Sequence, residues 1–201
     1  MNSSCIQPSI LLVDDDVKFL RALARSLRTK DYSIITTSHP TSALTTLDTV
    51  EVAVALLDEY LPGSGTDGLA LLTALKKKQS DIEVILITGD NSTSLVVQAI
   101  QAGATDFLTK PLDLVKLAQV LDQSIHRYQL RKQEDVALTK LPYREVKIQG
   151  IERERRYFTL LLQQRQHNLH EVSRITGIDR SNLRRRLHQL GFAILHPEKT
   201  P

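Results

Sequence analysis

Short apolar runs alternate with amphipathic segments over the first two thirds of the chain. The apolar runs predict β-strands at residues 10–13, 32–36, 52–57, 84–87 and 105–108. Apolar residues recur every three or four positions between them, and predict helices over 17–29, 41–47, 68–78, 94–102 and from 112 to about 131. Because the strands are almost wholly apolar and alternate with helices, we expect an α/β fold: a doubly wound, five-stranded parallel sheet with helices on both faces.

The last third of the chain has a different pattern. Residues 132–150 are polar, include Pro142 and end in glycine, which predicts a linker. Helical patterns follow over 151–166, 169–176 and 180–190 and predict a small all-α domain. The expected organisation is therefore a domain over 1–131, a linker over 132–150 and a second domain over 151–201.

Composition changes this picture little. The chain is 41% hydrophobic and 24% charged, which is ordinary for a globular protein. No apolar run approaches the roughly 20 residues that span a bilayer, and the N-terminus lacks a signal-peptide pattern. The single cysteine, Cys5, cannot form a disulfide within the chain. These features favour a cytoplasmic protein with no membrane partner.

Charge is divided unevenly along the chain. Residues 1–126 carry 10 basic and 15 acidic side chains, whereas residues 127–201 carry 16 basic and 8 acidic ones. A basic C-terminal domain favours a polyanionic partner, although a basic surface can also be simply solvated.

Polar residues follow the predicted strands at positions that meet in space. Asp14 and Asp15 follow the first strand, Asp58 the third and Thr88 the fourth, while Lys110 comes just after the fifth. Ligands of such sheets bind beyond the carboxyl ends of the strands. Clustered carboxylates repel one another unless a cation compensates them, and all-oxygen ligation suits Mg²⁺. The lysine and the hydroxyl would then face an incoming phosphoryl group.

Four motifs carry a family resemblance: "ILLVDDD", "LLDEYLP", "LITGD" and "DFLTKPLD", in this order. Over about residues 9–128 the chain resembles the receiver domain of two-component response regulators, which has a flavodoxin-like fold. The resemblance implies that Asp58 accepts a phosphoryl group from a sensor histidine kinase. It also implies that Asp14, Asp15, Asp58 and the backbone carbonyl of Tyr60 hold Mg²⁺.

The same resemblance implies roles for three more residues. Lys110 would contact the phosphoryl oxygens, Thr88 would be the switch hydroxyl and Phe107 the switch aromatic, and the Lys110–Pro111 bond would be cis. Asp16 has a separate prediction from the residues themselves, because an aspartate directly before a helix favours an N-cap over metal ligation.

One departure from the family lies between Asp58 and Gly68, which are ten residues apart where the family usually has eight. The two extra residues belong to a loop beside the phosphorylation site. They could affect the choice of kinase or the lifetime of the acyl phosphate, but every reactive residue remains present.

The basic C-terminal region contains two predicted helices joined by a turn at Gly177. Leucines lie on one side of the second helix, and polar or basic residues lie on the other. This arrangement is typical of a helix-turn-helix whose second helix enters the major groove of DNA. An earlier apolar stripe, Phe158, Leu161 and Leu162, predicts a packing surface, with a dimer interface as an alternative.

Residues 151–192 resemble the Fis-type DNA-binding domain of enhancer-binding response regulators. The resemblance implies a homodimer on double-stranded DNA. It implies base or groove contacts from Arg180, Asn182 and Arg184, and phosphate contacts from Arg185 and Arg186. Ser181, which faces the same side of the helix as Arg184, is a further candidate DNA contact. For each arginine, the alternative is a solvated helix face.

The sequence thus predicts a phosphorylation-controlled, DNA-binding transcriptional regulator that turns over no external substrate. No phosphate-binding loop of the GxxxxGK type is present, so ATP-driven remodelling of polymerase is not expected. One alternative is a short antagonist that heterodimerises with a full-length enhancer-binding regulator. Another is a Mg²⁺-dependent phosphatase, against which Tyr60 argues, since a general acid is expected two residues beyond the nucleophile.

Overall fold

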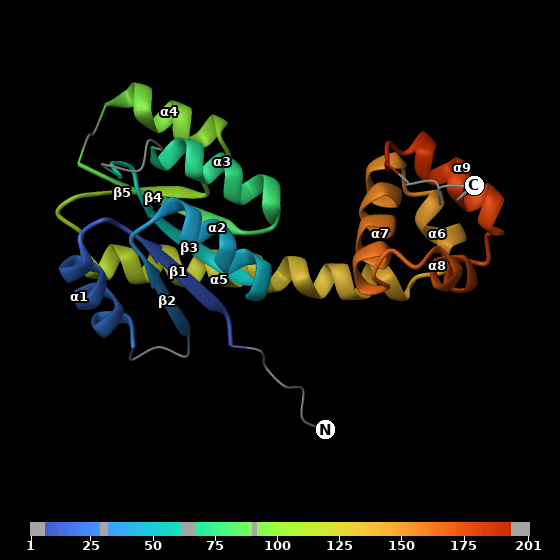
Figure 1. Ribbon diagram of the computed structural model, residues 1–201, viewed down its shortest axis with the longest axis horizontal. Coiled ribbons are helices and arrows are strands. Elements are labelled where there is room, and N and C mark those ends of the chain that lie inside the picture. Colours follow the sequence, from blue (N-terminus) through green and yellow to red (C-terminus); the bar gives the residue numbers. More distant parts are fainter. Residues whose placement is uncertain (1–6, 29–31, 62–66, 90–91, 194–201) are drawn as a thin grey trace, which may run out of the picture. The chain divides into compact units, whose positions relative to one another are not determined.

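The structure is a computed structural model that describes residues 7–28, 32–61, 67–89 and 92–193 (Figure 1). Cys5 and the loop residues 62–66 lie outside the described residues. The chain divides into two compact units, residues 1–130 and 131–201. Within the described parts, no helix combines the length and apolar character needed to cross a bilayer.

The first unit is built on a five-stranded parallel sheet in the order β2-β1-β3-β4-β5. The strands are β1 Ser9–Val13, β2 Ser33–Thr37, β3 Val52–Asp58, β4 Glu83–Thr88 and β5 Asp106–Thr109. Their helices are α1 Val17–Leu27, α2 Pro40–Thr49, α3 Gly68–Lys78, α4 Thr93–Gln101 and α5 Leu114–Lys140. The predicted strands and helices are all present. Their ends are shifted by at most two residues, except that α5 ends at Lys140 rather than at about residue 131.

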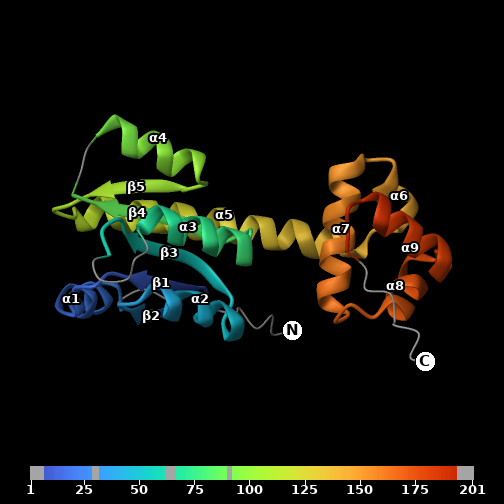
Figure 2. The same cartoon turned by 45° about the horizontal axis from the view of Figure 1, so that its top comes forward.

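The sheet separates two apolar cores (Figure 2). One core joins the sheet to α1 and α5, and the other joins it to α2, α3 and α4. Every residue of β3 and of β4 is buried, because helices cover both of their faces. This double covering explains why these two strands are apolar between their ends rather than alternating.

The second unit contains α6 Tyr143–Lys147, α7 Ile151–Gln164, α8 Leu169–Thr176 and α9 Arg180–Gln189. Its core includes Phe158, Leu161 and Leu162, which are at most 6% exposed. The stripe that these residues form is therefore a packing surface of its own unit, and the dimer interface proposed for it is wrong. Gly177 ends α8 with a φ of 70°, a left-handed conformation that glycine adopts without strain.

The linker expected over residues 132–150 is replaced by helical structure. α5 continues to Lys140, and α6 follows almost at once. Leu138 and Val146 are buried in the core of the second unit. Residues 129–140 are mostly good helix formers with no glycine or proline, so they continue the helix although their apolar residues are sparse.

Candidate functional site at the carboxyl edge of the sheet

Three strand ends bring polar side chains to one edge of the sheet. Asp14 follows β1, Asp58 ends β3 and Thr88 ends β4, and each is at most 5% exposed. The chain after β5 returns to the same edge, where the backbone N–H of Lys110 donates to the carbonyl of Thr88 at 2.8 Å. Parallel pairing places these ends together because all the strands run in the same direction.

The three predicted carboxylates form one cluster. Asp14, Asp15 and Asp58 each offer an oxygen within 4.8 Å of the others, and only Asp15 is exposed. Nζ of Lys110 lies 3.1 Å from Oδ2 of Asp14 and 3.0 Å from Oδ1 of Asp58. The structure thus brings together four of the residues that the sequence predicted to meet.

The environment of the cluster raises the pKa of Asp58. Burial raises its pKa most, the hydrogen bond from Lys110 lowers it, and the charge of Asp14 raises it again, so that the net shift is upward. Burial lowers the pKa of Lys110, but its hydrogen bonds to Asp58 and Asp14 outweigh this effect and leave that pKa raised. Lys110 therefore stays charged and compensates part of the carboxylate repulsion.

A divalent cation fits this donor set. When ionised, the three carboxylates of the cluster leave an excess of two negative charges over the single ammonium of Lys110. Hard carboxylate oxygens are the donors that Mg²⁺ prefers, and the exposed Asp15 leaves one side of the cluster open to solvent. Receiver domains bind Mg²⁺ at an acidic cluster of this kind.

Phe19 is a neighbour of this site that the sequence did not reveal. Its ring lies 5.2 Å from Nζ of Lys110, within the range of a cation–π interaction. Phe19 is in the first turns of α1, and nothing in the sequence links it to a lysine 91 residues later. The ring adds a second restraint on the position of the ammonium group.

Asp16 has a different role from its two neighbours. Its side chain accepts hydrogen bonds from the backbone N–H groups of Lys18 at 2.8 Å and Phe19 at 3.1 Å, at the start of α1. Its own N–H donates to Oδ1 of Asp14. The predicted N-cap is confirmed, and the aspartate triplet divides between helix capping and the acidic cluster.

We expect Asp16→Ala to lower the free energy of unfolding by about 1 kcal/mol, because the first turn of α1 loses the acceptor for two N–H groups. Urea denaturation of the full chain measures this change. Asp16→Asn is the matched control, since asparagine is an equally good cap and should leave most of the stability intact. Equal losses in both variants would contradict a capping role.

The remaining predicted residues lie on or directly after the strands that form this edge. Thr88 is buried at the end of β4, and Phe107 is half-buried on the neighbouring strand β5, where it pairs with Leu86. Tyr60 follows Asp58 by two residues, and its ring is 68% exposed. The Lys110–Pro111 bond is cis, as expected. The switch roles of Thr88 and Phe107, and metal ligation by the carbonyl of Tyr60, stay predictions.

Gly68 approaches the backbone of the site closely. A Cβ at this position would lie 2.5 Å from the carbonyl oxygen of Asp58 and 2.7 Å from Cα of Glu59. Its N–H donates to the carbonyl of Glu59 at 2.8 Å. The start of α3 therefore packs directly on the segment after Asp58, and the two extra residues must be accommodated in the intervening loop, whose residues 62–66 lie outside the described residues.

A second candidate surface is the exposed side of α9. It consists of the polar residues Arg180, Ser181, Asn182, Arg184 and Arg185, whereas Leu183 and Leu187 are buried on the opposite side. Nη2 of Arg185 donates to Oδ1 of Asn182 at 2.7 Å, and Asn182 itself pairs with Asp179, the N-cap of α9. Basic and amide side chains therefore stand together on one solvent-facing helix surface.

Arg186 differs from the other residues predicted to contact DNA. Its Nε and Nη2 donate to the carboxylate of Glu154 at 2.8 Å and 2.5 Å, and Glu154 is only 1% exposed. The hydroxyl of Tyr143 donates to the same carboxylate at 2.6 Å. Arg186 is thus held within its own unit, and we withdraw it from the expected phosphate contacts. Glu154, its partner, was missed because burial of a lone glutamate has no sequence signal.

An all-parallel sheet in this order, with carboxylates and a lysine at its carboxyl edge, defines the class of signal receiver domains. Residues 10–122 match the response regulator receiver domain family. This match covers more than half of the chain, and the chain belongs to that family.

Curated relatives include response regulators and transcriptional regulators. The chain is 31% identical over 127 residues to a putative NtrX-like response regulator of Rickettsia felis, which covers 63% of this chain and 27% of the relative. It is 34% identical over 122 residues to the DNA-binding transcriptional regulator NtrC of Klebsiella pneumoniae, covering 61% of this chain and 26% of that protein. The chain thus spans about a quarter of the length of these relatives.

Solved structures support the same fold for the first unit. The receiver domain of NtrX from Brucella abortus is 33% identical, with a TM-score of 0.55, over 58% of this chain and 98% of that one. A receiver domain from an HD domain-containing protein of Pseudomonas fluorescens is 31% identical, with a TM-score of 0.58, over 61% of this chain and 98% of that one. The first unit is therefore a response regulator receiver domain, homologous to the corresponding part of transcriptional regulators such as NtrC.

Proposed function

We propose that Asp58 accepts a phosphoryl group from a sensor histidine kinase and that this event controls DNA binding by the second unit. The observation that carries the first step is the convergence of Asp14, Asp15, Asp58 and Lys110 at one sheet edge. A carboxylate oxygen of Asp58 attacks the phosphorus, the P–N bond of the kinase phosphohistidine breaks, and the imidazole nitrogen takes up a proton.

The residues around Asp58 supply positioning and charge. Lys110 would contact a phosphoryl oxygen, since its Nζ already lies 3.0 Å from Oδ1 of Asp58. When bound by Asp14, Asp15, Asp58 and the carbonyl of Tyr60, Mg²⁺ supplies charge neutralisation to the phosphoryl oxygens. Phosphoryl transfer needs little covalent help, so this site suits acceptance of one phosphoryl group rather than turnover of an external substrate.

The response to phosphorylation would start at Thr88. A new acyl phosphate offers strong acceptor oxygens, towards which the Thr88 hydroxyl can turn from the end of β4. Phe107, half-buried on the neighbouring strand, would then move into the space that is vacated. The two side chains would thus bias the α4 and β5 region between two packings.

The output that we propose is binding to double-stranded DNA through a helix-turn-helix formed by α8 and α9. The exposed basic and amide side chains of α9 support this, since arginine can bind guanine bidentately and neutralise phosphates. Arg180, Ser181, Asn182 and Arg184 would contact bases or the groove, and Arg185 a phosphate. A homodimer would match two such helices to two half-sites.

Exposed apolar side chains on the first unit are consistent with self-association. Ile100 at the end of α4 is 64% exposed, and Leu114 and Val115 at the start of α5 are 55% and 70% exposed. Burying such residues against a second copy would be favourable.

The test of this function is genome-wide DNA binding by the full chain, followed by affinity measurements on a recovered site. Arg184→Ala should weaken binding by about 1–3 kcal/mol and relax specificity at one position, because a base contact is lost. Arg185→Ala should weaken binding to all sequences. It should also reduce the slope of the logarithm of the binding constant against the logarithm of the salt concentration by about one, because one phosphate contact is lost. Arg153→Ala, at an exposed position of α7 outside the two proposed DNA-binding helices, is the matched control for loss of one positive charge.

Other outcomes would redirect the proposal. Negligible DNA binding, combined with co-purification of a full-length enhancer-binding regulator, would favour the antagonist. Repeated hydrolysis of a phosphomonoester in the presence of Mg²⁺ would favour the phosphatase. Unchanged DNA affinity in both Arg184→Ala and Arg185→Ala would contradict the placement of the DNA contacts on α9.

A further inference from the structure

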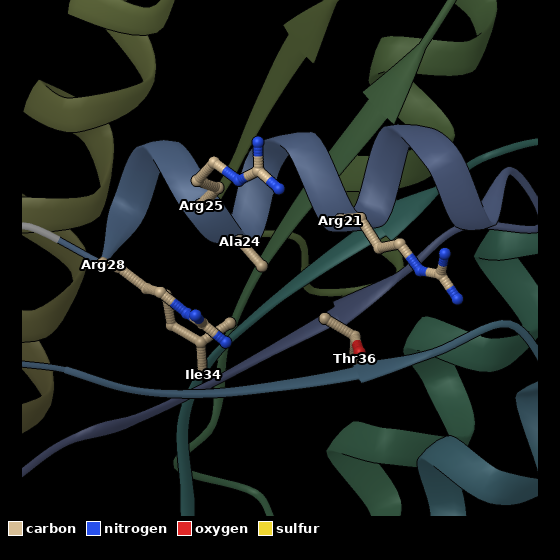
Figure 3. Close-up of a pocket in the computed structure, with 6 residues that line it drawn as sticks. All are labelled: Arg21, Ala24, Arg25, Arg28, Ile34 and Thr36. Carbon is tan, nitrogen blue, oxygen red and sulfur yellow. The ribbon is translucent and has the colours of Figure 1, made fainter.

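A groove lies between α1 and β2 on the first unit, away from the cluster around Asp58. Its volume is about 260 Å³. Three arginines, two apolar side chains and one hydroxyl line it: Arg21, Ala24, Arg25, Arg28, Ile34 and Thr36 (Figure 3). Neither the phosphoacceptor site nor the surface of α9 uses any of these residues.

The charge of this groove is one-sided. Arg21, Arg25 and Arg28 are all exposed and lie at i, i+4 and i+7, so they form a row along α1. α1 contains no acidic residue, and among the described residues no carboxylate forms a salt bridge with any of the three. The row is therefore available to a negatively charged partner.

The other wall of the groove belongs to an edge strand of the described sheet. The N–H of Ser33 donates to Pro8, and the carbonyl of Thr37 accepts from Asp14, so both residues direct their backbone groups towards β1. In a parallel ladder the residues between them direct theirs away. Ile34 and Thr36 are at these positions, and no hydrogen bond within the described residues involves their outward groups.

The repeat of the arginines along α1 matches the repeat of side chains along an extended chain. Arg21 and Arg25 are four residues apart on a helix, which is about 6 Å along its axis. Side chains on one face of a β-strand repeat every two residues, or about 6.6 Å. Figure 3 shows the three guanidinium groups spread along α1 rather than converging on one point. This layout suits a row of negative charges better than a single phosphate.

We propose that the groove between α1 and β2 binds an extended acidic segment of a partner protein, which adds a strand to the edge of β2. The backbone of the segment pairs with Ile34 and Thr36, and alternate Asp or Glu side chains face Arg21, Arg25 and Arg28. Strand pairing favours a polypeptide over a nucleic acid, because only a polypeptide supplies the matching N–H and C=O groups.

The test uses the full chain and the labelled peptide fluoresceinyl-Glu-Thr-Glu-Val-Glu-Thr-Glu-amide, with the dye on the N-terminal amine, in an anisotropy titration. Binding should weaken about threefold in Arg25→Ala and about 20-fold in the triple alanine variant of the three arginines, because each lost charge pair is partly screened by solvent. Lys18→Ala removes a positive charge from α1 outside the groove and should bind the peptide as the wild type does.

Two further measurements use only the wild-type chain, so their outcome does not depend on whether the variants fold. The amides of Ile34 and Thr36 should become protected from hydrogen exchange when the peptide is bound. Affinity should fall steeply as salt rises from about 50 mM to about 500 mM, as the Debye length shortens.

Several results would overturn the proposal. The groove is not an acidic-segment site if the peptide fails to bind, if its glutamine analogue binds equally well, or if the triple variant retains full affinity. Equal binding by a peptide with alternate N-methylated amides would exclude strand pairing. Duplex DNA that binds through the same arginines, while the peptide does not, would identify a nucleic acid surface instead.

Discussion

Asp58→Ala should abolish the change in oligomeric state and DNA affinity that we expect beryllofluoride with Mg²⁺ to produce in the wild-type chain. Beryllofluoride mimics a phosphoryl group only when a carboxylate oxygen binds it, and Asp58 is the buried carboxylate that Lys110 contacts at the end of the central strand β3. Size-exclusion chromatography with light scattering measures the first effect, and a DNA titration measures the second. The expected loss is complete.

The aspartates after β1 offer the matched controls for this experiment. Asp15→Ala should also prevent activation, because the exposed ligand of the acidic cluster is removed. Asp16→Ala should still be activated, since Asp16 caps α1. Identical activation of the wild type and Asp58→Ala would disprove the switch.

Mg²⁺ should raise the free energy of unfolding of the wild type by about 2.7 kcal/mol when its concentration is a hundred times the dissociation constant.

Glu154→Gln should destabilise the second unit by about 3 kcal/mol. Arg186 makes two hydrogen bonds to the Glu154 carboxylate, and Tyr143 makes a third. Breaking a buried ion pair from one side leaves the other charge poorly solvated, and the partial exposure of Arg186 at 30% places the cost at the lower end of its usual range. Chemical denaturation of the full chain, followed by the fluorescence of the tyrosines, measures it.

The same carboxylate should make stability depend on pH. Burial raises the pKa of Glu154, but the hydrogen bonds from Arg186 and Tyr143 outweigh this and lower it below the ordinary value of 4.5. Stability from this group is therefore fully present above pH 4.5 and is lost as the pH falls through the lower folded value. Glu154→Gln should remove this part of the acid sensitivity.

The exposed pair of Glu171 and Arg174 is the matched control. Their atoms are 2.8 Å apart, but Arg174 is 72% exposed, so solvent screens the attraction. Glu171→Gln should change stability far less than Glu154→Gln. Similar losses in the two variants would show that the burial of Glu154 does not matter.

Burial also separates the arginines of α9 into two environments that their sequence does not separate. Arg184, Arg185 and Arg186 are consecutive and chemically identical. The helical turn of 100° per residue directs the first two to solvent and the third towards Glu154 on α7. A variant at Arg186 should therefore be assayed for stability before any effect on DNA affinity is interpreted.

The sequence by itself determined the elements and the chemistry at the sheet edge. Strands such as β3 and β4 are apolar enough to be located from local pattern alone, and parallel strands deliver their carboxyl ends to one edge whatever their neighbours are. Asp14, Asp58 and Lys110 could therefore be predicted to meet. Asp16 could be separated from them because capping depends on neighbours within three residues.

Only the tertiary structure decided which distant groups become partners. The pairing of Arg186 with Glu154 and the contact of Phe19 with Lys110 have no local signature. The row of arginines beside β2 looks in sequence like an ordinary solvated helix face. Its significance depends on β2 being an edge strand, which strand order establishes and local periodicity does not. Periodicity reports which side of an element is buried, whereas the partner of each charge depends on how the elements pack.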